Sequence, residues 1–264
     1  MTETPALLQV DDLHVRYADG IDALRGLSFK LHPGERVGLI GPNGSGKTTL
    51  MLAIMHAVRF CGRIVLDTIE VNKQTEHVAR SRCGMIFQDA EDHLFMPTLW
   101  DDVAFGPLNQ GCDADEAQRR AGQAIAQVGL TGLEHRSAHH MSGGQKRAAA
   151  LATVLAMQVK LLLLDEPGAN LDGRSRGRLI DILDGRTEAM LLATHDLPMI
   201  HRLCSRVILL DQGQILADRP TASLLADTAL LSLHGLVDDP APGLAAGRQS
   251  GGVETGTQLV CNET

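Results

Sequence analysis

The octapeptide at residues 41–48, Gly-Pro-Asn-Gly-Ser-Gly-Lys-Thr, constrains the fold more than any other part of this chain. It fits the pattern G-x-x-x-x-G-K-[ST] and lies between an apolar run at 37–40, which predicts a strand, and a segment at 48–58, which predicts a helix. In that setting glycines let successive backbone N–H groups point at one phosphate, and Lys47 adds positive charge beside the β- and γ-phosphates. The segment therefore predicts a nucleoside triphosphate site. We call residues 41–49 the phosphate loop, with the candidate binding residues Gly41, Pro42, Asn43, Gly44, Ser45, Gly46, Lys47, Thr48 and Thr49.

A pair of carboxylates supplies a natural partner for the phosphate loop. The run of four leucines at 161–164 predicts a strand buried on both faces, and Asp165 and Glu166 follow it directly. An aspartate at such a strand end can hold Mg²⁺ through its water shell, and the neighbouring glutamate can polarise an attacking water. Two acids after a strand are also typical of a solvated surface. Together with the phosphate loop they predict a nucleoside triphosphatase, but not its kind.

The order of the other apolar segments indicates a mixed α/β core. Alternating residues at 8–17 and 24–31 predict short antiparallel strands, and 64–71 predicts a further strand. The alanine-rich stretch 114–128 predicts a helix, with Asp113 as its N-cap and Gly129 as its stop. Apolar runs that suit covered parallel strands recur at 37–40, 161–164, 189–193 and 207–210.

Composition excludes several classes of protein. The formal charge of −8 argues against a generic basic surface for nucleic acid. The longest apolar runs are far shorter than the ~20 residues of a membrane-spanning helix, and the first twelve residues lack the features of a signal peptide. We therefore expect a protein that stays in the cytosol.

Residues 238–264, rich in Gly, Pro, Ser and Thr, predict a flexible C-terminal tail, with a small docking tail as the alternative.

A second glycine-containing segment, Ser142-Gly143-Gly144-Gln145, opens a helix that we expect over 148–157. A serine N-cap explains the serine, but two glycines at a helix start cost stability and need a reason. Exposed N–H groups and the positive end of the helix dipole suit an anion. Because the phosphate loop already holds one triphosphate, we expect this helix start to face the γ-phosphate bound to a second copy of the chain.

Several motifs occur in the order found in the ATP-binding-cassette (ABC) ATPases, and the chain resembles that family over about residues 7 to 235. Tyr17 lies 30 residues before Lys47, and Gln88 stands in Phe-Gln-Asp. Residues 141–146, Met-Ser-Gly-Gly-Gln-Lys, resemble the family's signature segment, with Met141 in place of the usual leucine. Ala-Asn-Leu-Asp at 169–172 and Ala-Thr-His-Asp at 193–196 complete the set. Gly168 departs from the family, which usually has Thr or Ser there.

The resemblance implies a P-loop NTPase fold of the ABC nucleotide-binding type: an antiparallel β subdomain, a RecA-like mixed-sheet core and an inserted α-helical subdomain. We expect this ATPase domain over residues 1–237, with the helical subdomain at about 89–158. The implied cofactors are ATP and Mg²⁺. Tyr17 would stack on adenine, although in isolation the residue favours a core aromatic. The resemblance implies catalytic roles for Glu166, His195 and Gln88, and Mg²⁺ binding by Thr48, Gln88 and Asp165. The signature residues Ser142, Gly143, Gly144 and Gln145 would act on the ATP bound to the partner copy. A loop of Asn170, Leu171 and Asp172 would lie at the dimer interface.

The stretch from Phe87 to Pro107 resembles the energy-coupling-factor branch of the family, with Phe-Gln-Asp, Leu-Phe and Asp-Val-Ala-Phe-Gly-Pro in order. Four residues of it form an apolar cluster bordered by acids: Leu94, Phe95, Met96 and Trp100. This cluster could accept a partner's coupling helix that carries arginines, or it could pack the junction between core and helical subdomain.

Within that branch the chain looks most similar to the cobalt and nickel importers. The resemblance implies an ATPase at the cytoplasmic face of the cell membrane, working as a homodimer with an integral-membrane coupling subunit and a membrane substrate-binding subunit, and without nucleic acid. One alternative is the ATPase of an importer for a vitamin such as biotin; another is a soluble regulatory ABC ATPase. A P-loop kinase would leave the signature segment unexplained. His135, His139 and His140 have no carboxylate or cysteine at ligand spacing, so we do not expect them to bind metal.

Overall fold

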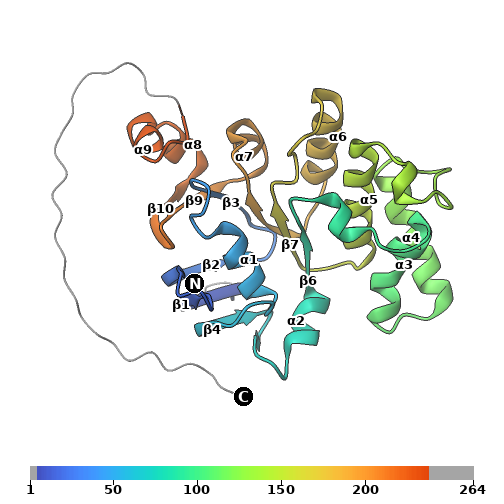
Figure 1. Ribbon diagram of the computed structural model, residues 1–264, viewed down its shortest axis with the longest axis horizontal. Helices are drawn as coiled ribbons and strands as arrows, with labels where there is room; N and C mark the ends of the chain where they lie inside the picture. The colour runs from blue at the N-terminus through green and yellow to red at the C-terminus, as the bar shows by residue number, and fades with distance from the viewer. Residues whose placement is uncertain (1–4, 238–264) are drawn as a thin grey trace.

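The computed structural model describes residues 5–237, which form two sheets and the helices around them (Figure 1). Within that range no helix has the length and apolar character needed to cross a membrane. The tail predicted for 238–264 lies outside the described residues.

The first sheet is antiparallel, as the alternating N-terminal segments predict. Its strand order is β2-β1-β4-β5, and Leu8 of β1 pairs with Leu31 of β2 on one side and Leu66 of β4 on the other. Alternate β1 side chains are buried against helix α1 and the second sheet. The strands are β1 (Leu8–Arg16), β2 (Asp22–Leu31), β4 (Cys61–Leu66) and β5 (Ile69–Glu70).

The second sheet has the order β10-β9-β3-β8-β7-β6 and is parallel except for its β10 edge. Its central strands are covered on both faces. In β7, Leu161 and Leu163 pack in the core shared with the antiparallel sheet, whereas Leu162 and Leu164 pack in the core beneath the helices. The leucine run is thus buried on both sides, as predicted. The strands are β3 (Arg36–Ile40), β6 (Cys83–Ile86), β7 (Leu161–Asp165), β8 (Ala189–Ala193), β9 (Arg206–Asp211) and β10 (Gln214–Pro220).

Helices α3, α4 and α5 pack on one another at one end of the second sheet (Figure 1). The predicted N-cap of α4 is confirmed, since Asp113 accepts a hydrogen bond from the Glu116 N–H at 2.8 Å. The helices are α1 (Lys47–Ile54), α2 (Glu76–Arg82), α3 (Leu99–Asn109), α4 (Ala114–Gln127), α5 (Gly143–Ala156), α6 (Gly173–Asp184), α7 (Leu197–Leu203), α8 (Thr221–Leu225) and α9 (Thr228–Leu233).

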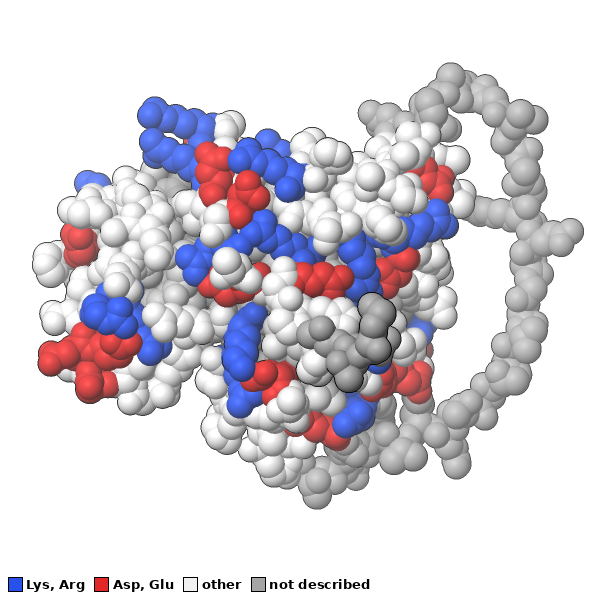
Figure 2. Space-filling view, turned by 180° about the vertical axis from the view of Figure 1, so that it is seen from behind, with Lys and Arg blue, Asp and Glu red and all other residues white. Residues whose placement is uncertain are grey.

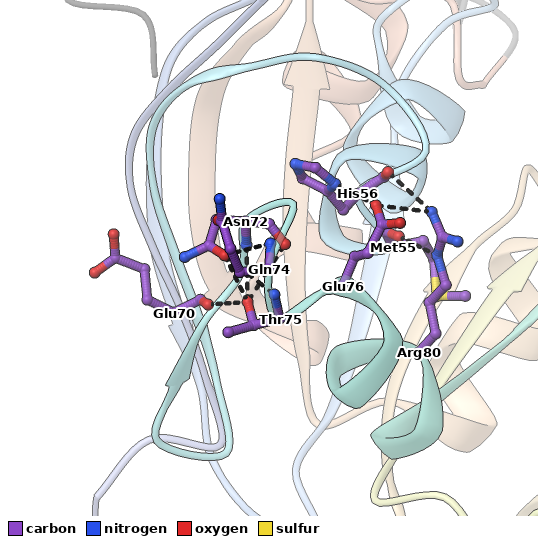
Figure 3. Close-up of polar contacts among 8 residues, drawn as sticks. All are labelled: Met55, His56, Glu70, Asn72, Gln74, Thr75, Glu76 and Arg80. Atoms are coloured by element: carbon purple, nitrogen blue, oxygen red, sulfur yellow. Dashed lines mark hydrogen bonds and ion pairs between the residues drawn. The ribbon is translucent and has the colours of Figure 1, made fainter. Parts of the chain in front are cut away.

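Helix α1 ends earlier than the predicted range of 48–58. His56 has a positive φ of 51°, which breaks the helix. Arg80 of α2 donates to the carbonyl oxygens of Met55 and His56 at 3.0 and 3.1 Å, and Glu76 bonds the His56 ring at 2.8 Å (Figure 3). The carbonyls at the helix end therefore find partners on α2.

The strand predicted over 64–71 is divided in the structure. Asp67 and Thr68 have φ values of 47° and 71° and form the two-residue turn between β4 and β5. Positive φ at both central residues is the geometry that matches the twist of a tight hairpin. Beyond β5, the Thr75 hydroxyl donates to the Glu70 carbonyl oxygen at 2.5 Å and leads the chain into α2 (Figure 3).

Charged side chains are mixed on the face of the molecule shown in Figure 2, where Lys and Arg lie among Asp and Glu in small groups. On α4, Arg119 and Arg120 both pair with Glu116. Partly exposed pairs of this kind contribute little to stability. Over the described residues on that face, no continuous basic surface is offered to a polyanion.

The close contact between β6 and α5 predicts that one methyl group added at Gly84 will lower the stability of the folded protein. A Cβ on Gly84 would lie 2.3 Å from Val154 Cγ1, so Gly84→Ala should destabilise the protein by about 1–3 kcal/mol through overpacking. Urea unfolding measures this. In the control Gly177→Ala the added Cβ meets open space on α6 and should stabilise by about 0.5–1 kcal/mol. Equal stability of the two variants would contradict this packing.

Candidate active site

Four neighbouring parallel strands end at one edge of the second sheet, and a candidate segment follows each of them. The strands are adjacent in the order β3-β8-β7-β6. The phosphate loop follows β3, His195 follows β8, Asp165 and Glu166 end β7, and Gln88 follows β6. Because the carboxyl ends of parallel strands meet at one edge, residues far apart in the sequence converge there.

Close backbone approach makes two glycines of the phosphate loop necessary. A Cβ on Gly41 would lie 1.9 Å from the Leu210 carbonyl oxygen of β9. Gly46 has a φ of 107° and stands at the N-cap of α1, where a Cβ would lie 2.8 Å from the Ala23 carbonyl oxygen. The loop is therefore held against β9 and the start of β2 in a shape that other residues cannot adopt.

Lys47 is buried inside the phosphate loop. Its ammonium donates to the carbonyl oxygens of Gly41 and Pro42 at 2.8 and 3.0 Å. Burial lowers the pKa of Lys47, and the charges of Glu166 and Asp165 act in the opposite direction. The cation thus lies where the β- and γ-phosphates of a nucleotide in this loop would need it.

Three predicted Mg²⁺ ligands line one cavity of about 480 Å³: Thr48, Gln88 and Asp165. The Thr48 hydroxyl donates to Asp165 Oδ2 at 2.6 Å, and Asp165 is only 4% exposed. Hydroxyl, carboxylate and amide oxygens are hard donors, which Mg²⁺ prefers. The donor set therefore fits the expected ion.

Glu166 is held between β7 and β8 in a strained backbone, with a φ of 45°. Its Oε2 accepts from the Thr194 hydroxyl at 2.8 Å, and its Oε1 accepts from the His195 N–H at 3.0 Å. The His195 ring lies 3.0 Å from Asn43 Oδ1 of the phosphate loop. The carboxylate, the histidine and the loop are thus one connected group.

Thr194 is a residue of this group that the sequence analysis did not identify. It is 2% exposed, and its hydroxyl orients Glu166. The signal was weak: a hydroxyl side chain at the end of an apolar strand, next to a candidate histidine.

Tyr17 lies at the rim of the phosphate loop rather than in the core. Its hydroxyl is 3.1 Å from Thr49 Oγ1, and the residue is 38% exposed. An exposed ring in that place is accessible to a nucleotide base, so its expected adenine contact remains a prediction.

The signature segment begins helix α5 earlier than predicted. Ser142 Oγ accepts from the Gln145 N–H at 3.3 Å, and Gln145 Oε1 accepts from the Ser142 N–H at 2.9 Å. This reciprocal capping box starts the helix at Gly143 rather than at 148. A Cβ on Gly144 would lie 2.7 Å from Ser175 Oγ, whereas one on Gly143 would meet open space. A side chain on Gly144 would therefore displace Ser175, whereas one on Gly143 would displace nothing in its own chain.

The loop at 169–172 lies beside the signature segment through that same Ser175. Asp172 is the N-cap of α6 and accepts from the N–H and the hydroxyl of Ser175 at 3.0 and 2.8 Å. Asn170 has a φ of 60°, and Leu171 lines the cavity that contains Thr48. Gly168 lies under α7, where a Cβ would be 2.9 Å from Met199 Cε. A side chain at this position would therefore require the end of the Met199 side chain to move.

The predicted apolar cluster at 94–100 divides in the structure. Leu94 and Trp100 pack against the core beneath the helices, as the junction alternative proposed. Phe95 is 65% exposed and contacts the ring of Phe105 edge to face, with centroids 5.2 Å apart. We call Phe95 and Phe105 the aromatic pair. No group of three His, Cys, Asp or Glu residues that could hold a metal occurs among the described residues.

Comparison with known proteins decides the family. The sequence profile described as ABC transporter matches residues 24–169. The chain belongs to the ABC transporter family. It is an ATPase of the ABC type, similar to energy-coupling factor ATP-binding proteins.

Two named relatives and one solved structure support this assignment, and a second solved structure supports the fold. The energy-coupling factor transporter ATP-binding protein EcfA of Methanothermobacter thermautotrophicus is 34% identical, over 98% of this chain and 85% of that protein. A Streptomyces coelicolor protein, named provisionally as an ABC transporter ATP-binding protein, is 44% identical over 89% of this chain and 90% of its own length. The cbiO1 structure from Clostridium perfringens, described as part of the ABC transporter complex cbiONQ, is 29% identical over 87% of this chain and 96% of that chain, with a TM-score of 0.76. An ATP-binding cassette bound to ADP and Pi, 23% identical over 81% of this chain and 98% of that chain, shares the fold with a TM-score of 0.72.

Proposed function

We propose that this ABC ATPase powers the uptake of cobalt or nickel through separate membrane subunits. The convergence of Lys47, Asp165, Glu166 and His195 at one sheet edge carries the catalytic part of the proposal. The similarity to EcfA proteins and to cbiO1 of cbiONQ supports the transporter part.

ATP would bind with its phosphates in the phosphate loop and its adenine on Tyr17. Lys47 would exchange the carbonyl oxygens of Gly41 and Pro42 for phosphate oxygens, as a flexible ammonium can. Mg²⁺ held by Thr48, Gln88 and Asp165 would neutralise charge on the β- and γ-phosphate oxygens.

Glu166 is proposed as the general base. Its carboxylate already has both oxygens hydrogen-bonded, so its orientation is set before substrate arrives. It would accept a proton from the attacking water, while His195 steadies the γ-phosphate from β8.

Glu166→Gln tests this assignment directly. The amide keeps an oxygen acceptor but cannot take a proton, so kcat should fall by about 10²–10⁴ while ATP binding is retained. Steady-state ATPase rates and equilibrium ATP binding give the two values. The control Glu134→Gln alters a carboxylate in the loop before α5 and should keep the wild-type rate. Undiminished hydrolysis by Glu166→Gln would remove Glu166 from the role of base.

A second copy of the chain would close the site. The open space at Gly143 is the observation that supports this, because nothing in its own chain requires a glycine there. A bare helix start with free N–H groups can approach the γ-phosphate of ATP bound to the partner. Residues 142–145 of each copy would then act on the other copy's nucleotide, with the loop at 170–172 at the interface.

The aromatic pair is proposed as the contact for a membrane subunit. Leu108, 50% exposed and one turn beyond Phe105, extends the apolar surface along α3. Buried Asp102 supports it from below, since its Oδ1 accepts from the N–H groups of Phe95 and Met96 at 3.0 and 2.9 Å. A short partner helix with apolar and basic side chains would match this surface and the exposed Asp101 beside it.

Transport by the whole complex tests the importer proposal. Phe95→Asp should reduce co-purification with the membrane subunits at least about tenfold, because it places a charge in an apolar contact. The control Leu233→Asp alters an exposed leucine of α9 and should keep the complex intact.

Vesicles with the intact complex should accumulate Co²⁺ or Ni²⁺ when ATP is supplied. Uptake of biotin and neither metal would support the vitamin alternative and contradict the metal proposal, as would ATPase activity indifferent to any membrane subunit.

A further inference from the structure

Arg147 is a buried cation on α5, one turn beyond the glycines of the signature segment. It is 6% exposed, and its guanidinium donates to two consecutive carbonyl oxygens, those of Phe87 at 2.9 Å and Gln88 at 2.6 Å. Burial lowers the pKa of Arg147, and Asp89 opposes this. A guanidinium is costly to bury, so a buried one that bonds backbone carbonyls holds that backbone firmly in place.

His93 bonds the backbone of the same residue, Phe87, at its N–H group. Its Nε2 accepts from the Phe87 N–H at 2.9 Å, and the two rings pack with centroids 5.1 Å apart. Because Nε2 accepts, the neutral ring carries its proton on Nδ1. The N–H and C=O of Phe87 and the C=O of Gln88 are therefore all bonded to side chains instead of to a neighbouring strand.

We propose that Arg147 and His93 are positioning residues for Gln88, which they hold toward the cavity shared with Thr48 and Asp165. The inference deepens the proposed function, since it rests on Gln88 as a ligand of the nucleotide-bound cation. Gln88 lies just beyond the last residue of β6, where no sheet pairing fixes its backbone. Two side chains replace that pairing.

The geometry also couples two parts of the site. Arg147 belongs to the helix that begins with the signature segment, so a displacement of α5 relative to β6 would carry the Gln88 carbonyl with it. A lysine would hold these carbonyls less rigidly, because an ammonium on a flexible stem lacks the fixed donor geometry of a planar guanidinium.

Cation affinity separates a positioning role from a merely structural one. The probe is Mn²⁺ binding, measured by electron paramagnetic resonance, to the purified full chain with a non-hydrolysable ATP analogue. Arg147→Met should raise the Mn²⁺ Kd about tenfold, the effect expected when a group that orients a ligand is lost. Analogue binding without a divalent cation should stay at the wild-type value, because the phosphate loop is untouched. Arg147→Lys should fall between the two.

Matched controls come from the chain itself. Arg36 donates to the carbonyl oxygens of Asp184 and Arg186 from the start of β3, at the opposite end of that strand from the phosphate loop. Arg36→Met should lower stability but leave the Mn²⁺ Kd unchanged. His93→Gln, which keeps an acceptor, should stay close to wild type, whereas His93→Leu should weaken Mn²⁺ binding. This pair remains informative if Arg147→Met does not fold.

Gln88→Ala distinguishes the two levels of the proposal. If Gln88→Ala weakens Mn²⁺ binding but neither Arg147→Met nor His93→Leu does, the positioning role is wrong and the proposed function stands. If Gln88→Ala leaves the Mn²⁺ Kd unchanged, Gln88 is not a ligand of the cation. The proposed Mg²⁺ role of Gln88 and the positioning role of Arg147 and His93 then both fail. Parallel losses in all three variants, with Arg36→Met unaffected, support the inference.

Discussion

The parallel pairing of β3, β8, β7 and β6 is the constraint on which the rest of the structure depends. It delivers four chain segments to one edge, so that Lys47, His195, Glu166 and Gln88 come from four different strand ends. Such pairing requires strands that are apolar on both faces and helices that cover them. The two hydrophobic cores above and below β7 meet that requirement. The geometry of the proposed catalytic site is thus a consequence of sheet burial.

Around that edge, hydrogen bonds from polar groups fix the residues that lie beyond the strand pairing. Thr194 and the His195 N–H orient Glu166, Asp165 bonds Thr48, and Arg147 holds the carbonyls beyond β6. Thr194, Asp165 and Arg147 are buried, and buried polar groups fix geometry because they lose energy when displaced. The site is therefore rigid at its base. The face with the signature segment and the aromatic pair is left to contacts with other chains in our proposal.

Local patterns predicted the phosphate loop, the carboxylate pair and the doubly covered strands, because each depends on residues adjacent in sequence. The family motifs added Gln88 and His195 as candidates. What could not be predicted depends on distant partners. Beyond the end of helix α1, Arg80 of α2 bonds the carbonyl oxygens of Met55 and His56. Phe95 is exposed, whereas Leu94 and Trp100 pack against the core. Gly144 lies against Ser175, a contact between two helices that no local pattern contains.

The central claim is that each nucleotide is enclosed by two polypeptides, and mixing two inactive variants tests it most directly. Lys47→Ala should lose ATP binding and Ser142→Arg should block the partner's site, so each alone should be inactive. In a mixed dimer the phosphate loop of one and the signature segment of the other form one intact site. Equal mixing should restore up to about a quarter of wild-type hydrolysis. Affinity-tag capture shows whether mixed dimers form. Mixed dimers that form but are as inactive as either variant would contradict the account.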